Sequence, residues 1–431
     1  MGILQNEFDR VLEDQCSASN LTKLAVRHAL KQRNPQLTEE RLTTSVKAIS
    51  AAILEAKEGT INLSFEMEGE SPDKRIEIDD SDLQSALQQV EDKFSSNITK
   101  VITQSIDEMS PSVLSRLYAS ASEALRHRHK QQRLFEKRLR NRWKEGIDRL
   151  EMLVMIAQEA GGIFLQDVQR AHEQAEGMVS REELCLLDAL VRIHVRSCRI
   201  ACEVLCLLKG GFADGANARW RSLHENAVIA MFIVQCGGDV AERYLAHSAV
   251  ERYRAAQQYQ QHSQALGEEP LDDTELNELA QAQAGLVAKY GNDFRNEYGW
   301  AANALGYPAP RFADIERHLD MSRWRPYYKM ACHSVHAGAQ GLYFLLAVIE
   351  PTEPTLLAGA SNAGLCDPGH STAISLTMVS AAMFTAKANI DSLVTAQVMT
   401  ELCDHIGDAF LNAHHKLVED ARQGHDLVVV Y

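Results

Sequence analysis

Residues 181–236 read REELCLLDALVRIHVRSCRIACEVLCLLKGGFADGANARWRSLHENAVIAMFIVQC and contain two apolar helical segments in direct succession. The first, 181–209, carries apolar side chains at helical spacing and ends at Gly210-Gly211, and the second, 214–236, ends at Gly237-Gly238. Glycine directly after an apolar helical repeat is typical of a helix end. Helices joined by so short a connection pack as antiparallel neighbours, so this stretch predicts a helical bundle.

The whole chain is predicted to be mainly α, in three parts. Residues 1–110 are expected to form an N-terminal helical region with one β-hairpin at 60–79, because apolar and polar residues alternate on both sides of a turn-rich segment. Residues 111–160 are expected to form a long basic connecting helix that begins after Pro111 and stops at Gly161-Gly162. Residues 161–431 are expected to form the helical bundle that carries the candidate site. Its last helices are predicted at 325–349, 370–395 and 398–423.

Composition limits the classes of function. The chain has 431 residues, 45% of them hydrophobic, and a formal net charge of -15, so attraction of nucleic acid to the whole surface is not expected. The N-terminus lacks a signal-peptide pattern, and no apolar stretch is long enough to span a bilayer. The nine cysteines form no regular framework. We therefore expect a cytoplasmic protein with no membrane partner.

One segment departs from the acidic balance. Residues 126–144, RHRHKQQRLFEKRLRNRWK, contain nine Lys and Arg residues and one acidic residue. The residues expected to contact a phosphate backbone, RNA in particular, are Arg126, Arg128, Lys130, Arg133, Lys137, Arg138, Arg140 and Arg142. Phe135 and Trp143 are the candidate stacking groups. The alternative is a solvated helix face or a partner for acidic groups of the same chain.

The sequence has no strong catalytic signature: it lacks a phosphate-binding loop, a dinucleotide fingerprint and a metalloprotease motif. Cys198, Cys202 and Cys206 recur every four residues among aliphatic side chains and are interpreted as buried core thiols. The histidines near the C-terminus lack the spacing of metal ligands. No cofactor and no metal are expected.

Two segments together indicate a candidate site. Arg221 and Glu225 are one helical turn apart, just ahead of the apolar run AVIAMFIV, where charged side chains need partners if they are buried. Tyr328, Cys332 and His336 recur at four-residue spacing on the helix expected at 325–349 and would form one stripe. That stripe is predicted to supply those partners.

At these segments the sequence resembles an uncharacterised bacterial helical family, the domain of unknown function fifty-six seventy-seven. The resemblance covers about 150–350 and rests on three features. These are Arg-Ser-Leu-x-Glu at 221–225, a tryptophan at 300, and a Tyr-x-x-x-Ser-x-x-x-His-Gly pattern, here Tyr328, Cys332 and His336. Cys332 replaces the serine of the family and Ala337 precedes the glycine. Because the family has no established activity, the resemblance implies a fold and a site but no reaction.

The pattern is also distantly similar to the HEPN superfamily of helical bundles, many of which are metal-independent ribonucleases of toxin and phage-defence systems. Their Arg-to-His spacing matches Arg219 with His224, and Arg311 with His318. This similarity implies an imidazole that acts as acid and base on the ribose hydroxyl and an arginine that stabilises the phosphorane. Such sites are often completed across a dimer interface, and a homodimer is the expected oligomer.

Three hypotheses therefore stand. The first is a HEPN-like ribonuclease or nucleic-acid-targeting effector in phage defence or stress. In it, His336 or His224 would transfer protons, Arg219 and Arg221 would hold the phosphate, and Glu225 and Tyr328 would orient these groups. The second is a non-catalytic helical module that binds a protein or ligand, with the same residues as a buried structural network. The third is an enzyme that acts on a small phosphorylated substrate.

Overall fold

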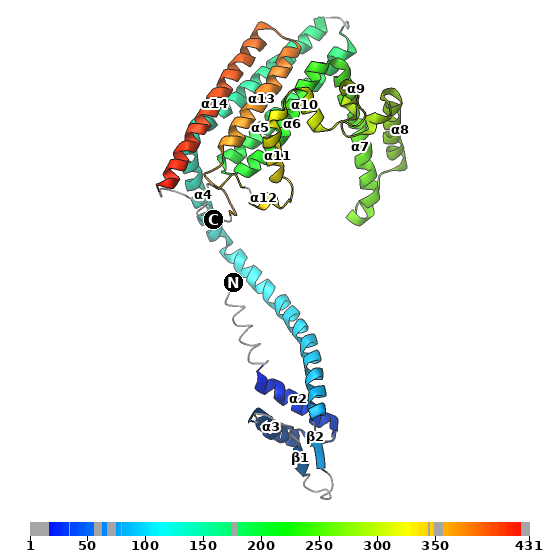
Figure 1. Cartoon of the computed structure of the whole chain (residues 1–431), viewed down its shortest axis with the longest axis vertical. Helices are drawn as coiled ribbons and strands as arrows, with labels where there is room; N and C mark the ends of the chain where they lie inside the picture. Colours follow the sequence, from blue (N-terminus) through cyan, green and yellow to red (C-terminus); the bar gives the residue numbers. More distant parts are fainter. Residues whose placement is uncertain are drawn as a thin grey trace. The chain divides into compact units, whose positions relative to one another are not determined.

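The structure is a computed structural model that describes residues 17–33, 35–55, 63–66, 75–78, 80–174, 179–343, 345–348 and 357–423. The fold is mainly helical, as predicted (Figure 1). The chain divides into two compact units, Met1–Leu125 and Arg126–Tyr431, and each is described by itself.

The N-terminal unit contains helices α2 (Ala18–Arg33) and α3 (Glu39–Glu55), strands β1 (Leu63–Glu66) and β2 (Arg75–Ile78), and the start of helix α4 (Asp80–Gln174). The strands pair antiparallel, with Leu63 opposite Ile78, and residues 67–74 between them lie outside the described part of the chain. The core of this unit is small, because α2 and α3 contact each other over one face only. It consists of Ala25, Val26, Ala29, Leu30, Leu42, Val46, Ile49 and Ala86.

Two predicted helix boundaries are wrong. Helix α4 runs through both Pro111 and Gly161-Gly162 without a break. Proline inside a helix leaves one carbonyl without its usual donor. The side chains of residues 109–118 are all exposed, so water can reach that carbonyl, and the Ser110 hydroxyl donates to Ile106 O at 2.6 Å. Gly161 does not end the helix but permits close packing of α4 against the His194 ring. A Cβ at this position would lie 2.5 Å from Cε1 of His194.

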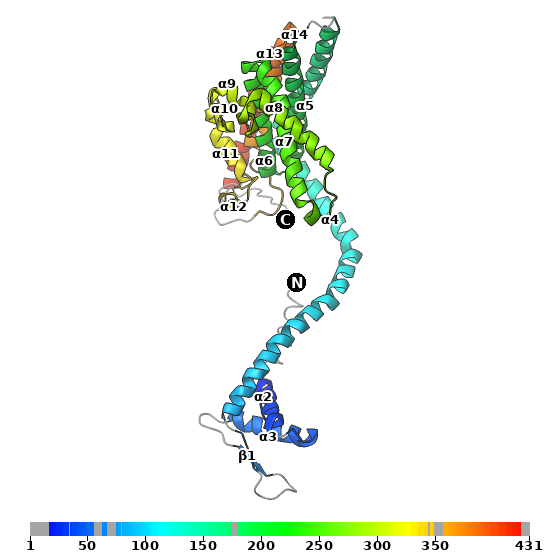
Figure 2. The same ribbon diagram turned by 90° about the vertical axis from the view of Figure 1, so that its right-hand side faces the viewer.

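The second unit is a bundle in which helices α5 (Arg181–Lys209), α6 (Ala213–Cys236), α13 (Cys366–Ala386) and α14 (Ile390–Arg422) pack side by side in both views (Figures 1 and 2). The C-terminal half of α4 joins the same core through Trp143, which packs on Phe410 of α14. Two large polar side chains of the core have hydrogen-bond partners. The Trp220 indole N–H donates to Ser371 O at 2.9 Å, and His194 Nε2 lies 3.1 Å from Ser380 Oγ. Burial lowers the pKa of His194 to about 4, so this imidazole is neutral at pH 7.

The short connection between α5 and α6 is as predicted. Gly211 has a φ of 80°, a region that favours glycine, and a Cβ there would lie 2.7 Å from Ser361 O. Helices α6, α7 and α13 all contact α5. Cys198 is buried as predicted, whereas Cys202 and Cys206 are exposed.

The chain between α6 and α13 forms a helical pair and then a series of short elements. Helices α7 (Gly238–Leu266) and α8 (Asp273–Tyr290) contact each other. They are followed by η1 (Asn292–Arg295), η2 (Gly299–Ala301), α9 (Ala302–Leu305), α10 (Phe312–His318), η3 (Ser322–Trp324), α11 (Arg325–His333) and α12 (Gln340–Tyr343).

The late helices differ from the predicted ranges. The helix expected at 325–349 ends at His333, because the chain turns so that the backbone N–H groups of Leu346 and Ala347 donate to the Asp214 carboxylate. The helices expected at 370–395 and 398–423 are separated at 387–389 instead. Asn389 begins α14 there with a reciprocal capping box to Ser392. Within the described residues, the search for a helix long and apolar enough to cross a membrane found none.

The two glycines inside α4 provide a matched test of this packing. Gly161→Ala should lower the free energy of unfolding by about 1–2 kcal/mol, because the new methyl group collides with His194. Gly162→Ala should instead raise it by about 0.5–1 kcal/mol, because no atom lies within 4 Å and alanine is the better helix former. Thermal and chemical denaturation of both variants provide the measurement. Equal effects of the same sign would contradict the close contact of α4 with α5.

Candidate functional site

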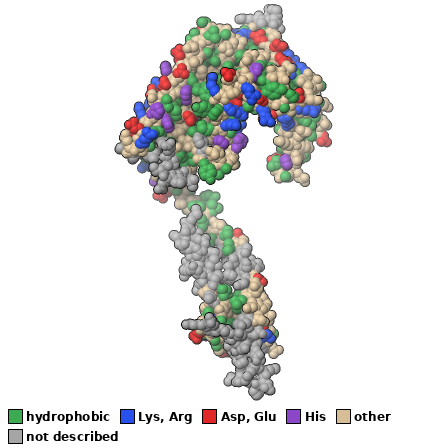
Figure 3. Space-filling view, viewed as in Figure 1, with side chains coloured by type: hydrophobic (Ala, Val, Ile, Leu, Met, Phe, Trp, Pro, Cys, Tyr) green, Lys and Arg blue, Asp and Glu red, His purple; other side chains and the backbone are tan. Residues whose placement is uncertain are grey.

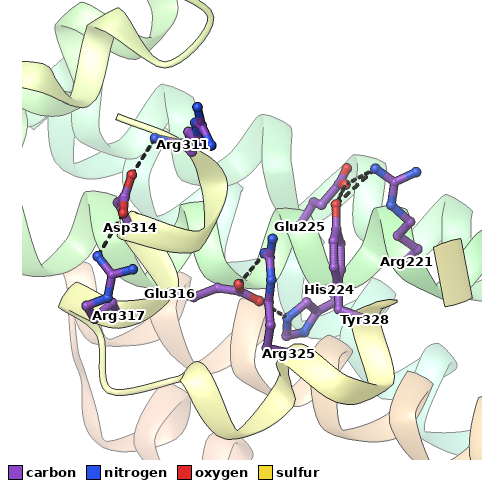
Figure 4. Close-up of polar contacts among 9 residues, drawn as sticks. All are labelled: Arg221, His224, Glu225, Arg311, Asp314, Glu316, Arg317, Arg325 and Tyr328. Atoms are coloured by element: carbon purple, nitrogen blue, oxygen red, sulfur yellow. Dashed lines mark hydrogen bonds and ion pairs between the residues drawn. The ribbon is translucent and has the colours of Figure 1, made fainter. Parts of the chain in front are cut away.

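A polar cluster joins three helices of the bundle (Figure 4). Helix α6 contributes three of its side chains one turn apart, α10 contributes one, and α11 contributes two. The polar cluster consists of Arg221, His224, Glu225, Glu316, Arg325 and Tyr328.

The Tyr328 hydroxyl is the centre of one half of the polar cluster. It donates to Glu225 Oε1 at 2.6 Å and accepts from Arg221 Nη2 at 2.9 Å. Arg221 Nη2 also lies 3.1 Å from Glu225 Oε1, so the three groups close a triangle. Burial, together with the hydrogen bond to the Glu225 carboxylate, raises the pKa of Tyr328, and the phenol stays protonated at neutral pH. Tyr328 therefore acts as a donor here and not as a nucleophile.

Glu316 is the centre of the other half. Its carboxylate accepts from His224 Nε2 at 3.2 Å and from Arg325 Nη1 at 2.7 Å. The side chains of Glu316 and His224 are only 1% and 2% exposed, so the two groups are desolvated together. The rings of Phe312 and Tyr328 pack against the imidazole. The one histidine of the polar cluster is thus closed off from solvent.

The polar cluster is balanced in charge and reaches solvent only at its rim. Two arginines face two glutamates, and the guanidinium carbons of Arg221 and Arg325 lie 5.0 and 5.2 Å from the Tyr328 ring centroid. The side chains of Arg221, Glu225 and Arg325 keep exposed fractions between 24% and 33%. Lys and Arg side chains gather on the face near α10 and α11 (Figure 3). The arrangement fixes α10 and α11 on α6, buries His224 and Glu316, and leaves Glu225 partly exposed within an ion pair with Arg221.

The structure brings together Arg221, Glu225 and Tyr328, and it separates the other candidates from them. Arg219 forms an ion pair with Glu203 of α5. His336 lies in the turn after α11 and is exposed, because the helix ends three residues earlier. The predicted stripe of Tyr328, Cys332 and His336 is therefore wrong beyond the end of the helix.

The Arg-to-His pairs suggested by the HEPN spacing do not share a site. His224 faces Glu316, whereas the Arg219 side chain contacts α5. At the second pair, the Arg311 backbone N–H donates to Asp314 Oδ2 at 2.8 Å, a local helix cap (Figure 4). His318 packs on Phe232 instead.

Sequence reasoning missed Glu316 and Arg325. Glu316 directly follows the buried Ile315 on a short helix, and an acidic residue in a buried position indicates a required partner. Arg325 precedes Tyr328 by three residues and so lies on the same side of α11. Both signals were present in the sequence, but the predicted continuous helix at 325–349 drew attention to His336.

The basic segment of α4 contains a second set of candidates. The side chains of Arg126, Lys130, Arg133 and Lys137 are exposed, and we call these four residues the cationic stripe. Arg128 and Arg138 are exposed as well. Further along the helix, cations find acidic partners: Arg140 and Lys144 pair with Asp148, and Arg142 pairs with Asp420.

The predicted stacking role of the two aromatic residues in this segment is wrong. Phe135 is 2% exposed and Trp143 is fully buried. They occupy the side of α4 that faces the core, where the Trp143 indole N–H donates to Asn362. An amphipathic helix with a wide polar face hides its aromatic residues in this way.

Fold and site together define an α-helical bundle domain with a charge-balanced polar cluster. Residues 187–351 match the model of the family of unknown function DUF5677, so this segment of the chain is similar to that family. The match contains all six predicted site residues as well as Glu316 and Arg325. No curated protein and no solved structure matches the chain. The similarity to the HEPN superfamily stays a prediction.

The polar cluster should behave as a structural element. Tyr328→Phe should lower the free energy of unfolding by about 1–2 kcal/mol, because the hydroxyl that bridges Arg221 and Glu225 is lost. Tyr327→Phe is the matched control, since the neighbouring Tyr327 is 47% exposed and should tolerate the change. Urea denaturation followed by circular dichroism measures both. A Tyr328→Phe variant as stable as the wild type would refute the structural role.

Proposed function

We propose that this protein is a helical RNA-binding module in which the cationic stripe of α4 contacts the phosphate backbone and the polar cluster serves as scaffold. One observation carries the proposal. In a chain of net charge -15, the four exposed cations of the stripe make no ion pair among the described residues. Unpaired cations that recur along one exposed surface are the electrostatic footprint of a phosphate-binding element.

The spacing of the cationic stripe supports this function. Arg126, Lys130, Arg133 and Lys137 follow one another at intervals of three or four residues, which return to the same side of a helix with 3.6 residues per turn. Phe135 projects from the opposite side and is buried. The stripe therefore faces solvent along about three helical turns. Residues 126–134 are exposed on every side of the helix, and Phe135 packs the end of the stripe against the core.

The polar cluster supports a scaffold role more than a catalytic one. Its two arginines are already paired with carboxylates, and its histidine is 2% exposed. An arginine that clamps phosphate must offer free donors to the ligand. The stripe on α4 offers exposed cations that form no ion pair among the described residues.

The binding prediction concerns salt dependence. Replacement of the stripe, as Arg126→Gln/Lys130→Gln/Arg133→Gln/Lys137→Gln, should weaken binding to a single-stranded RNA of mixed sequence. The slope of log affinity against log salt concentration should fall in magnitude by about 3, since each neutralised phosphate of a single strand contributes about 0.7. Fluorescence anisotropy between 50 and 200 mM salt, a range over which such contacts respond strongly, measures the slope.

A variant of equal charge change is the control. Arg192→Gln/Arg196→Gln/Arg199→Gln/Arg252→Gln removes four exposed cations from α5 and α7. This variant should retain the wild-type slope, because its charges lie outside the stripe. Equal losses in both variants would show that net charge alone governs binding and would contradict the proposal.

Ribonuclease activity is the second candidate function, and the exposure of His336 favours it. Of the two candidate histidines, only His336 can reach a substrate. If the domain cleaves RNA without metal, cleavage in EDTA should be lost in His336→Ala at an unchanged melting temperature. His333→Ala, at the end of α11, is the control and should retain cleavage. If RNA stays intact with the wild-type protein, the ribonuclease hypothesis is wrong and RNA binding alone remains as the proposed function.

A further inference from the structure

A pocket adjoins the cationic stripe within the same unit. It has a volume of about 390 Å³ and is formed by α4, by the segment that precedes α13, and by α14. This volume lies in the range of small-molecule sites. The lining residues are Phe135, Arg138, Leu139, Asn141, Arg142, Asn362 and Lys416.

The lining is strongly cationic. Arg138, Arg142 and Lys416 contribute three positive charges, and no acidic residue lines the pocket. Asp420 neutralises Arg142 from α14. In the described part of the chain, neither Arg138 nor Lys416 forms an ion pair, so two positive charges remain uncompensated at this site.

A buried indole fixes the orientation of the Asn362 amide at the pocket wall. The fully buried Trp143 donates its indole N–H to Asn362 O at 3.0 Å and to Asn362 Oδ1 at 3.1 Å. Because an indole N–H can only donate, the oxygen of the amide must face it. The amide NH₂ group of Asn362 then remains available as a donor. It makes no hydrogen bond to another described residue.

The wall behind this amide is tightly packed. Ser361 N donates to Gly211 O at 2.9 Å, and a Cβ at Gly211 would lie 2.8 Å from the Phe135 ring. The segment that carries Asn362 is therefore held against the α5–α6 connection. A site with fixed donors loses little conformational entropy when a ligand binds.

We propose that this pocket binds a phosphate monoester, and that its ligand is the terminal phosphate of the RNA strand whose backbone lies along the cationic stripe. The inference rests on the proposed function. Two uncompensated cations match a terminal phosphate, which carries a charge of about -1.5 to -2 at neutral pH, better than an internal phosphodiester. Arg138 supplies a planar fork of donors, Lys416 a point charge, and Asn362 a neutral donor. Arg138 directly follows Lys137, so the stripe leads to the pocket.

A free mononucleotide has the same chemistry, and the experiment separates the two sources. Three versions of one short single-stranded RNA are compared by anisotropy: with a 5′-phosphate, with a 3′-phosphate, and with hydroxyls at both ends. Adenosine 5′-monophosphate alone is titrated in parallel and followed by calorimetry. The wild-type protein should bind one of the phosphorylated strands about tenfold more tightly than the hydroxyl strand, the value of one or two charge-assisted hydrogen bonds.

The key variant is Arg138→Gln/Lys416→Gln. It should lose the preference for the phosphorylated end and bind the hydroxyl strand within about twofold of the wild type, because the cationic stripe is intact. Both side chains are exposed, so the melting temperature should not change. Arg192→Gln/Arg196→Gln removes two exposed cations from α5 and should retain the preference.

The outcomes distinguish this inference from the proposed function. If RNA binds but the end group makes no difference and the mononucleotide gives no heat, the pocket does not bind a phosphate monoester. If no RNA binds while the mononucleotide binds and requires Arg138 and Lys416, the RNA-binding function fails and the ligand is a free nucleotide. If the stripe variant loses the preference while the pocket variant retains it, the phosphate is bound by the stripe and the assignment to the pocket is wrong.

Discussion

The hydrogen bonds of the buried Glu316 carboxylate fix α10 and α11 on α6. A carboxylate that is 1% exposed is unfavourable unless hydrogen-bond donors surround it, and His224 and Arg325 are those donors. Helices α10 and α11 have seven and nine residues, too few for an isolated helix to be stable in water. Their positions therefore depend on α6, which offers a polar face at 221–225 and an apolar one beyond it. Asp214 at the start of α6 fixes the chain in the same manner where it leaves α12.

Helix α4 presents two different faces because of its helical period. From residue 135 to residue 144, one side of the helix carries the buried Phe135, Leu139 and Trp143, and the other carries cations. The buried side includes Trp143, whose indole also fixes Asn362. Packing in the core thus determines both the direction of the cationic stripe and the shape of the adjacent pocket. A change in the core at Trp143 would move the proposed RNA contacts without touching them.

Much of the fold was predictable from local pattern, and the failures have physical causes. Residues 181–236 have apolar periodicity and glycine ends, and the structure places α5 and α6 there. Gly161 was wrongly interpreted as a helix end, because the glycine instead permits a close contact with His194. Pro111 was wrongly interpreted as a helix start, because an exposed helix tolerates a proline there. Arg221, Glu225 and Tyr328 could be proposed because charged residues near apolar runs need partners. The partners of Glu316 could not be proposed, because no pattern in a single sequence reports which helix faces a buried carboxylate.

The distribution of charge separates the two groups of cations in function. In the polar cluster each arginine meets a carboxylate, and the folded chain alone accounts for its presence. On α4, Arg126, Lys130, Arg133 and Lys137 repel one another at intervals of three and four residues, which destabilises a helix by a few tenths of a kcal/mol per pair. None of these four cations forms an ion pair among the described residues. Ion pairing within the described part of the chain therefore does not account for this row of charges. A polyanionic partner is the simplest source of the missing opposite charge.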